Sequence, residues 1–475
     1  MEPEQIMDKI VGLIKDYLKS QKQNQLLEYK DPMALQEILK LDEFKDGAGW
    51  PQIFTWIEKY LTYSVKTNHP GFVNRMWVGA NLPSIIGEMV AAVSNTSSCT
   101  YESAPVSTLM EKYMLQEILD LVGFKNGEGQ MTTGSSNANM LAMMAARNES
   151  LPSVKTQGLF GQQDLVAFVS ADAHYSMDKA ANILGLGTER LIKVPVNGLG
   201  EMDMNLLEEN LEKAVDKGAL PFFVAGTVGT TVRGAYDSID GLLRLREKFK
   251  FWLHIDGAWG GAVIVSDMLR KKYMNGIEHV DSFSWDFHKM LGTSLMCNVL
   301  LINNRPHTLG RVCSGGDESY IFHNSADNEV QDLGTVSLQC GRRVDSLKWF
   351  LDWKFFGKKE FGRWVEYSLE LCGYAESIVR ESDSLELILP RNSFNICFRY
   401  KAPEEIANKL NLAIRNALYH EGISLVGYAF VNDTLFLRLL LAGHDLVQKD
   451  IDQYFSAFIE TGKSLEKQYR TGGIC

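Results

Sequence analysis

The chain has few cysteines and arranges them without any recognisable motif. Its 7 cysteines are scattered along 475 residues, their number is odd, and no two follow a CxxC spacing. This distribution argues against a disulfide framework and against a zinc site, and it favours a reducing compartment. We therefore expect a cytoplasmic protein without a metal centre.

Long apolar runs and a surplus of basic residues are also missing. No stretch approaches the roughly 20 apolar residues that a membrane-spanning helix needs, and the acidic start MEPEQIMDKI is unlike a secretory signal. The formal net charge is -11, which leaves no basic stripe for nucleic acid. We expect neither a membrane nor nucleic acid among the partners. An acidic small substrate is not excluded, because the local field of a site can oppose the net charge.

Repeats and low-complexity linkers are absent as well, so the organisation has to be inferred from apolar periodicity. From about residue 110, short β-rich apolar runs alternate with helical stretches. This alternation predicts an α/β domain whose mainly parallel sheet is covered on both faces. The expected strands cover residues 165–169, 191–194, 222–225, 251–255 and 299–302. The expected helices cover residues 107–121, 137–147, 204–217 and 242–249.

The two ends of the chain have a different texture. Near the start, Ile6, Ile10 and Leu13 recur at helical spacing, which predicts an amphipathic helix that packs on its own chain or on a partner subunit. After residue 343 we expect a long aromatic-rich helix, followed by further elements at 394–400, 406–420 and 435–440. The predicted division is a helical N-terminal segment, a large domain and a small α+β domain, with the bounds 1–90, 91–345 and 346–475.

The stretch from residue 251 to 291 carries the most chemistry. Asp256 ends the apolar run FWLHID, and the pair His288-Lys289 follows one crossover later. Pyridoxal 5'-phosphate (PLP) needs such residues: a lysine holds its aldehyde as a Schiff base, and a carboxylate keeps its pyridine nitrogen protonated. The small Ala258 would let the ring lie close. Taken alone, Asp256 could equally cap a turn, and Lys289 could be a solvated surface charge.

Three further segments could complete a PLP site. In TTGSSNANMLAMMAAR, Ser135 and Ser136 open a helix whose N-terminus suits a phosphate dianion, although any N-capped helix has this pattern. His174 follows an expected strand and could stack on a pyridine ring, but a lone histidine is more often a structural hydrogen-bonding group. Thr227 in AGTVGTT could reach the cofactor, or it could belong to an ordinary glycine-rich turn.

Several long sequence blocks, taken in their order along the chain, resemble those of the PLP-dependent decarboxylases of the glutamate, cysteine-sulfinate and aspartate group, within the fold-type I superfamily. The resemblance runs from about Asn68 to the last helix. It implies a mainly parallel seven-stranded sheet, a small α+β C-terminal domain, and a homodimer interlocked by the N-terminal helices, with its sites at the subunit interface. The blocks are TYESAPVSTLMEKYML, AHYSMDKAANILGLGT, GTVGTTVRGAYD, HIDGAWGGA, HKMLG and LQCGRRVD.

The resemblance also implies roles for individual residues. Lys289 matches the Schiff-base lysine, Asp256 the partner of the pyridine nitrogen, and His174 the ring-stacking histidine. Tyr320 matches a loop tyrosine that protonates the carbanion. Arg438 matches the arginine that takes the substrate α-carboxylate, and an isolated charge in an apolar strand needs such a partner. Further cofactor contacts match Ser135, Ser136, Thr227 and His288.

The chain departs from the family pattern in two places. The family usually has Asn-Pro before His-Lys, whereas this chain has Asp286-Phe287. Asp286 adds a negative charge near the cofactor and is expected to shift the pKa of the imine. Arg75 and Trp77 stand where the acidic-substrate enzymes usually carry Gln and a small residue in the substrate pocket. We expect Arg75 to pair with a distal acidic group and Trp77 to shorten the pocket.

Together these residues predict the α-decarboxylation of a small acidic L-amino acid to the amine and CO₂. Aspartate, cysteine sulfinate and glutamate are the candidate substrates, and the short pocket favours the first two. Another PLP reaction on the same scaffold, such as aromatic amino-acid decarboxylation or aldehyde synthesis, is a second hypothesis. A catalytically silent PLP-binding homologue is a third. Tyr320 favours plain decarboxylation, and the intact set of site residues argues against a silent homologue.

Overall fold

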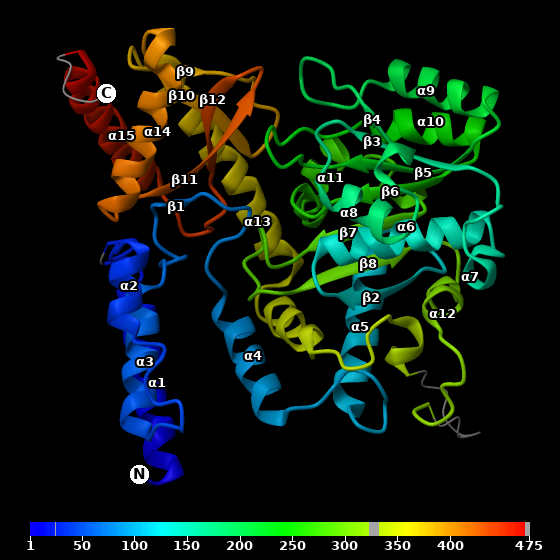
Figure 1. The fold of residues 1–475 in the computed structure, drawn as a ribbon, viewed down its shortest axis with the longest axis horizontal. Coiled ribbons are helices and arrows are strands. Elements are labelled where there is room, and N and C mark those ends of the chain that lie inside the picture. Colours follow the sequence, from blue (N-terminus) through cyan, green and yellow to red (C-terminus); the bar gives the residue numbers. More distant parts are fainter. Residues whose placement is uncertain (24, 323–331, 471–475) are drawn as a thin grey trace. The chain divides into compact units, whose positions relative to one another are not determined.

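The computed structural model describes residues 1–23, 25–322 and 332–470, which form two compact units (Figure 1). We call residues 80–369 with 391–394 the large unit, and residues 1–79, 370–390 and 395–475 the small unit. Each unit therefore combines separate stretches of the chain, whereas the ranges predicted from the sequence are consecutive. The small unit joins both ends of the chain because β1 (Phe72–Val73) pairs in parallel with β11 (Leu425–Val431).

A seven-stranded, mostly parallel sheet forms the centre of the large unit within the described residues, which confirms the expected fold class. The strand order is β2-β8-β7-β6-β5-β3-β4, with β8 antiparallel to both of its neighbours and the other pairs parallel. The apolar runs predict all of these strands except β2 and β7, which contain more polar residues. The bounds are β2 (Glu128–Thr132), β3 (Leu165–Ser170), β4 (Leu191–Val194), β5 (Leu220–Thr227), β6 (Trp252–Asp256), β7 (Ser282–Asp286) and β8 (Asn298–Ile302).

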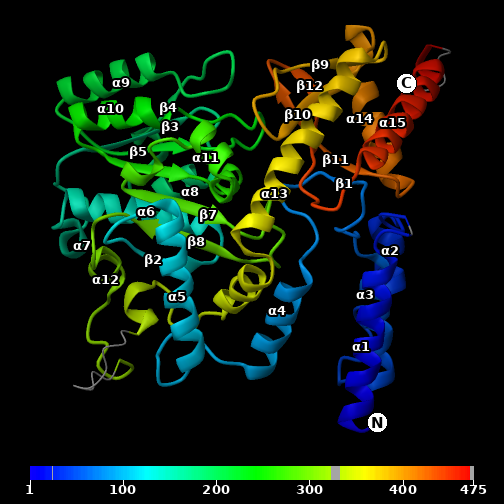
Figure 2. The ribbon, with the colours of Figure 1, turned by 180° about the vertical axis from the view of Figure 1, so that it is seen from behind.

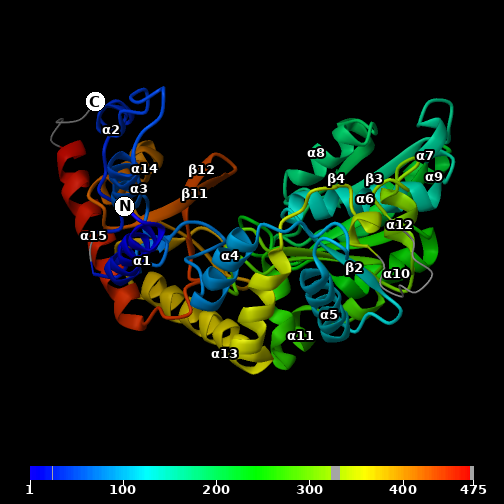
Figure 3. The same ribbon diagram turned by 90° about the horizontal axis from the view of Figure 1, so that it is seen from below.

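Helices cover both faces of this sheet, as the alternating pattern predicts. Figure 3 shows α6 and α8 on one face, and α5, α10 and α11 on the other. The four helices expected in this region are all present, within a few residues of the predicted bounds. The bounds are α4 (Leu82–Ser94), α5 (Pro105–Val122), α6 (Ser135–Ser150), α7 (Val154–Gln157), α8 (Ser176–Ile183), α9 (Met204–Asp216), α10 (Ile239–Phe249), α11 (Asp267–Tyr273) and α12 (Thr308–Cys313).

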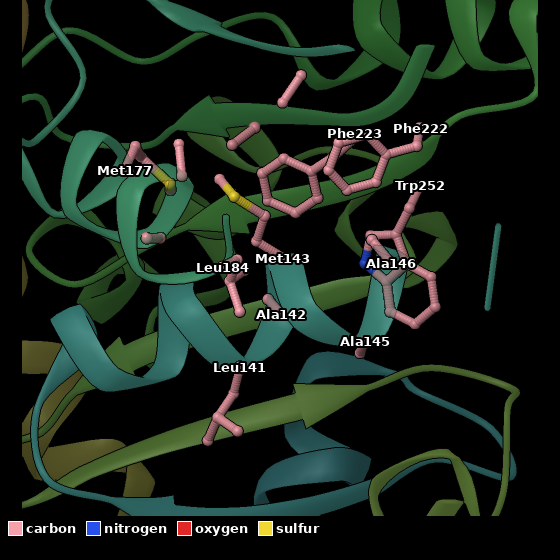
Figure 4. Close-up of a cluster of buried hydrophobic side chains, with 14 of the residues drawn as sticks. Leu141, Ala142, Met143, Ala145, Ala146, Met177, Leu184, Phe222, Phe223 and Trp252 are labelled. Atoms are coloured by element: carbon pink, nitrogen blue, oxygen red, sulfur yellow. The ribbon is translucent and has the colours of Figure 1, made fainter. Parts of the chain in front are cut away.

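The core between α6 and the sheet explains why α6 is rich in alanine. Ala142, Ala145 and Ala146 are fully buried, and their small side chains let the helix lie close to the strands. Figure 4 shows Ala146 beside the ring of Trp252 from β6, while the ring of Phe223 from β5 lies next to Met143. This tight packing fixes the N-terminus of α6 at the edge of the sheet where β2 ends.

In the part of the chain that the structure describes, the small unit contains a five-stranded sheet and the helices from both ends of the chain. Its strand order is β1-β11-β12-β10-β9, and α14 and α15 lie side by side (Figures 1 and 2). The long helix α13 (Asp345–Glu381) contributes to both units and is kinked at Gly357, where φ is 70°. The remaining bounds are β9 (Leu385–Leu387), β10 (Asn395–Tyr400), α14 (Glu404–His420), β12 (Thr434–Leu440) and α15 (Gln448–Arg470).

The N-terminal helices belong to the small unit. The helix predicted from the spacing of the first apolar residues is α1 (Pro3–Ser20), and it packs against α3 (Trp50–Tyr63). Between them lies α2 (Pro32–Leu39), which Asp31 caps by accepting hydrogen bonds from the amides of Met33 and Ala34. Of the helices in the described ranges, none combines the length and the apolar character that a bilayer crossing requires.

Candidate active site

Most of the expected site residues of the large unit gather at one edge of the sheet, where β5, β6 and β7 end. Thr227, the last residue of β5, pairs with Asp256, the last residue of β6, and Asp256 pairs with Ser284 on β7. These strands are parallel, so their carboxyl ends lie together at the edge where α/β sheets bind ligands. The sheet therefore places Thr227, Asp256 and Asp286 on three neighbouring strands.

Asp256 is buried and is supported by neutral donors. Its side chain is 3% exposed. Asn139 Nδ2 of α6 donates to Asp256 Oδ2 at 2.8 Å, and the Ala258 amide donates to Oδ1 at 3.1 Å. Neither donor carries a charge, so the negative charge of the carboxylate remains available to a ligand.

Lys289 pairs with the second carboxylate, Asp286. Lys289 Nζ lies 3.1 Å from Asp286 Oδ2, and the lysine side chain is 21% exposed. Asp286 Oδ1 accepts hydrogen bonds from Ser135 Oγ at 2.9 Å and from Asn298 Nδ2. Burial acts to raise the pKa of Asp286, but the Lys289 and His288 charges and the Ser135 hydrogen bond outweigh burial and lower it. Asp286 is therefore an ionised carboxylate beside the lysine.

His288 fills the space behind this ion pair. It is buried, and its Nδ1 lies 2.8 Å from the Cys297 carbonyl oxygen and 3.1 Å from the Cys297 amide nitrogen, so the tautomer of the ring decides which of the two groups it bonds. Its Nε2 lies 3.7 Å from Asp286 Oδ2. Burial lowers the pKa of His288, although Asp286 acts in the opposite direction.

His174 lies among the same charged groups. It is partly buried, and its Nδ1 accepts a hydrogen bond from the Ser176 amide at 3.3 Å. Burial lowers the pKa of His174, while Asp256 raises it and Lys289 lowers it. Asn139 Nδ2 donates both to Ser176 Oγ and to Asp256 Oδ2, so the segment that carries His174 lies beside Asp256 as expected.

The N-terminus of α6 lies beside the ion pair, because Ser135 contacts Asp286. Gly134 precedes the helix with φ 102°, a left-handed conformation that favours glycine, and a Cβ there would lie 2.6 Å from Met296 Cε. Ser135 is buried and Ser136 is exposed. The first backbone amides of a helix have no partner within it, so this turn can bind an anion.

The gathered residues fit PLP in charge and in hydrogen-bonding capacity. Thr227 Oγ1 is buried and has no hydrogen-bond partner among the described residues, which suits a polar ligand group. Asp256 can hold a proton on a pyridine nitrogen, and Lys289 is an amine for the aldehyde. The small side chain of Ala258, next to Asp256, is also buried. The α6 N-terminus would accept the phosphate.

Tyr320 stands apart from this group. It is 75% exposed, and it lies just before residues 323–331, which are outside the described ranges. A side chain that exposed is not packed against the buried Asp256 or Asp286. Its expected role as a proton donor therefore remains a prediction.

Arg438, Arg75 and Trp77 belong to the small unit. Arg438 lies on β12, is partly buried and donates to the Asn74 carbonyl at 3.1 Å. Burial lowers the pKa of Arg438, and the nearby Arg75 cation lowers it further. Arg75 itself is exposed. Trp77 packs against Phe72, with ring centroids 5.2 Å apart, so at least one face of its ring belongs to a small apolar cluster.

Two asparagines of the site were not predicted from the sequence. Asn139 lies four residues after Ser135, and therefore on the same face of α6. Asn298 begins β8 and donates to Ser135 Oγ at 3.0 Å as well as to Asp286. A polar residue inside the alanine- and methionine-rich helix was a usable signal for Asn139. For Asn298 the sequence offers no comparable signal, because its partners are distant along the chain.

Comparisons with known proteins agree with this geometry. The family described as the pyridoxal-dependent decarboxylase conserved domain matches residues 32–401. The chain is 33% identical to the acidic amino acid decarboxylase GADL1 of Xenopus tropicalis over 94% of this chain and 90% of that protein. It is also 33% identical to human cysteine sulfinic acid decarboxylase, over 92% of this chain and 91% of that protein.

Solved structures give the same result. The crystal structure of mouse CSAD matches with a TM-score of 0.92 and 30% identity, covering 97% of this chain and 98% of that chain. The structure of Oryza sativa TDC with PLP and tryptamine matches with a TM-score of 0.89 at 23% identity, which supports the fold alone. The chain thus belongs to the family of pyridoxal-dependent amino-acid decarboxylases, which are carboxy-lyases with PLP as their cofactor.

Proposed function

We propose that this chain removes the α-carboxylate of a small acidic L-amino acid and releases the amine and CO₂. The observation that carries the proposal is the grouping of Asp256, Lys289 and the unpartnered Thr227 hydroxyl at one edge of the sheet. The similarity to an acidic amino acid decarboxylase and to a cysteine sulfinic acid decarboxylase supports aspartate, cysteine sulfinate and glutamate as candidates.

The chain's own residues would divide the work around the cofactor. When bound, PLP withdraws electrons from the α-carbon of an attached amino acid. Asp256 holds a proton on the pyridine nitrogen, and Lys289 provides the amine that retains the cofactor between turnovers. His174 and Ala258 would contact the ring, and Thr227 would donate a hydrogen bond to it. Ser135 and Ser136 would bind the phosphate. His288 would support the ion pair between Lys289 and Asp286.

The substrate-binding residues are assigned by the same proposal. Arg438 would bind the α-carboxylate, because a partly buried guanidinium is matched best by a carboxylate. Arg75 would bind the distal acidic group, and its exposed side chain leaves it accessible. Trp77 would limit the length of the substrate. Tyr320 would return a proton to the α-carbon from a loop that closes over the substrate and excludes water.

We further propose a cytoplasmic homodimer with the site at the subunit interface. One face of α4 supports the dimer, because large apolar side chains are exposed along it and an apolar face of this kind fits a second copy of the chain. These side chains are Leu82, Ile86, Met89, Val90 and Val93. A reducing compartment is supported by the free state of the cysteines within the described ranges. Val93→Glu should lower the dimer fraction in sedimentation equilibrium, and an unchanged fraction would exclude this face.

The test of the function is CO₂ release by the PLP-loaded protein from L-aspartate, L-glutamate, L-cysteine sulfinate and L-DOPA in parallel. We expect release from one or more of the three acidic substrates. Release from L-DOPA alone would favour an aromatic amino-acid decarboxylase. Absence of release from all four, with PLP bound, would favour another PLP reaction or a silent homologue.

Two variants test the assigned substrate and product roles. Arg75→Gln should change the preference among acidic substrates more than turnover, and an equal loss on every substrate would exclude its pocket role. In air, Tyr320→Phe should raise the release of aldehyde and ammonia relative to amine, because dioxygen can oxidise a carbanion that lacks its proton donor. An unchanged product ratio would remove Tyr320 from this step.

A further inference from the structure

A row of buried polar side chains extends from Asp256 into the sheet. Trp252 and His254 come from β6, Ser282 from β7 and Asn139 from α6, and each is 5% exposed or less. The distances from one end to the other are 2.8 Å from Trp252 Nε1 to Ser282 Oγ, 2.8 Å from Ser282 Oγ to His254 Nδ1, 3.0 Å from His254 Nε2 to Asn139 Oδ1, and 2.8 Å from Asn139 Nδ2 to Asp256 Oδ2.

The Asp256 end fixes the direction of the hydrogen bonds in this row. An ionised carboxylate can only accept, so Asn139 Nδ2 faces Asp256 and Asn139 Oδ1 faces His254. His254 Nε2 therefore donates to Asn139 Oδ1, and in a neutral ring Nδ1 is then left to accept the Ser282 hydroxyl proton. At the far end, the indole N–H of Trp252 can only donate, and its hydrogen bond to Ser282 Oγ agrees with this direction.

Two side contacts reinforce this orientation. Ser284 Oγ donates to Asn139 Oδ1 at 3.0 Å, and Asn139 Nδ2 donates to Ser176 Oγ at 3.0 Å. An amide flipped end for end would place its nitrogen against two donors and its oxygen against the Asp256 carboxylate. Asn139 therefore has one acceptable orientation, and in that orientation it offers Asp256 a donor.

The row requires an uncharged His254, because a protonated ring would turn Nδ1 into a donor facing the Ser282 proton. Burial lowers the pKa of His254 to about 4, against smaller opposite effects of the Asp256 charge and of a hydrogen bond with the Ser282 backbone. Asp256 is the charged side chain that acts on it, while its other neighbours Ser282, Asn139 and Phe223 carry no charge. The ring is therefore neutral at physiological pH.

We propose that Trp252, Ser282, His254 and Asn139 form a one-way hydrogen-bond relay that holds Asp256 as an anion and thereby keeps the pyridine nitrogen of the cofactor protonated. The four are positioning residues, since they act through Asp256. The inference rests on the proposed role of Asp256 in PLP binding. Hydrogen bonds donated to a carboxylate favour its ionised form, and the relay holds the Asn139 amide with its nitrogen toward Asp256 Oδ2, which disfavours a proton on that oxygen.

The first test needs no cofactor. In protein labelled with ¹⁵N-histidine, the resonances missing from His254→Gln belong to His254. We expect them to show a proton on Nε2, a bare Nδ1, and no titration between pH 5 and 8. Trp252→Phe frees Ser282 to reverse its hydroxyl and should populate the other tautomer. A His254 that is protonated in this pH range, or that carries its proton on Nδ1, would overturn the relay.

The second test uses PLP labelled with ¹⁵N in its ring. In the wild-type protein we expect the chemical shift of a protonated pyridine nitrogen. Asn139→Ala and Ser282→Ala should move this shift toward the unprotonated value and lower kcat by about tenfold or more, with KM little changed. For Trp252→Phe in the first test, the matched control is Trp349→Phe, because the indole N–H of Trp349 is buried without a partner among the described residues.

The outcomes separate this inference from the proposed function. A ring nitrogen that stays protonated in both Asn139→Ala and Ser282→Ala would overturn the relay even if the protein decarboxylates acidic amino acids. A wild-type protein that binds PLP but releases no CO₂ would contradict the proposed function and leave the nitrogen shift as a valid test. A protein that binds no PLP would overturn both.

Discussion

Two neighbouring strands end in a buried aspartate, and the two aspartates have opposite surroundings. Asp256 ends β6 and Asp286 ends β7, and each is 3% exposed. Asp256 accepts hydrogen bonds from the neutral Asn139 amide and the Ala258 backbone. Asp286 lies 3.1 Å from the Lys289 cation and accepts a hydrogen bond from Ser135.

The comparison shows that position at a strand end does not decide what a carboxylate does. The charge of Asp286 is already compensated by a cation of the same chain, so it contributes mainly to orienting Lys289. The charge of Asp256 has no cation within the described hydrogen bonds, so it can act on a bound ring. Buried ionised groups need such compensation, and the missing part at Asp256 fits the pyridinium of PLP.

The largest effect is expected from Lys289→Ala. This substitution removes the amine that pairs with Asp286 and that would hold the cofactor. Without it, PLP has no covalent attachment, and activity should fall by about 10³-fold or more. The absorption band of the bound imine should disappear from the purified protein. Lys289→Arg is the control, because it keeps the charge beside Asp286 but cannot form the bond. A variant of either kind that retains the band would show that another lysine holds the cofactor.

Asp256→Asn should produce the next largest effect. Asparagine keeps the size of the side chain but removes the charge that holds a proton on the ring, and kcat should fall by about 10²- to 10³-fold. PLP should remain attached, because Lys289 is unchanged. Steady-state kinetics with the absorption spectrum of each variant measures both effects. If Asp286→Asn lost more turnover than Asp256→Asn, the assignment of the two carboxylates would have to be exchanged.

The sequence predicts the architecture well because the fold is driven by features that are local in the chain. Apolar runs identify β3, β4, β5, β6 and β8, and helical periodicity identifies the helices between them. The strands β2 and β7 were not predicted. In β7, Ser282 and Ser284 alternate with Phe283, which is typical of a strand with one exposed face, yet both serines are fully buried.

The site divides in the same way. Lys289, His174 and Asp256 follow strands or form motifs, so their spacing reveals them, and the structure brings them together. The partners that set their charges were not predictable, because Asn139, Asn298 and Ser282 reach the site through contacts between distant strands and helices. The role of Tyr320 could not be derived from the pattern of apolar residues either, because an exposed side chain has no packing that would fix its position.

Glu111→Gln sharpens the comparison with a third buried carboxylate, one that lies outside the site. Glu111 on α5 is fully buried, and Arg342 Nη1 donates to its two oxygens at 2.8 and 3.0 Å. Breaking this pair should lower the free energy of unfolding by about 3–5 kcal/mol. Denaturant unfolding measures the loss, and the spectrum of bound PLP should not change. A spectral change as large as that of Asp256→Asn would show that burial alone causes both.

Acid should weaken the surroundings of Asp256 through His254. The ordinary histidine pKa is 6.5, and burial lowers that of His254 to about 4. Between these values the unfolded chain binds a proton that the folded chain does not, so stability is complete above pH 6.5 and falls as the pH drops toward 4. The loss amounts to about 3 kcal/mol. His174 and His288 act in the same direction. The free energy of unfolding of His254→Gln, measured from pH 7 to 4, should fall less steeply than that of the wild type. Equal slopes would contradict the neutral state of His254.

Asp286→Asn is expected to have the smallest effect, and it tests the other half of the comparison. It removes the negative charge 3.1 Å from Lys289 Nζ but keeps a polar group for Ser135 and Asn298. An anion near the imine favours its protonated form, so its loss should shift the spectral transition of bound PLP to lower pH by about one unit. The control is Asp352→Asn, another buried carboxylate, which accepts hydrogen bonds from Asn81 and Thr293. A transition that does not move in Asp286→Asn would mean that Asp286 only orients Lys289. A transition that also moves in Asp352→Asn would mean that the shift reflects the loss of any buried charge, and the contrast between the two strand ends would then rest on Asp256 alone.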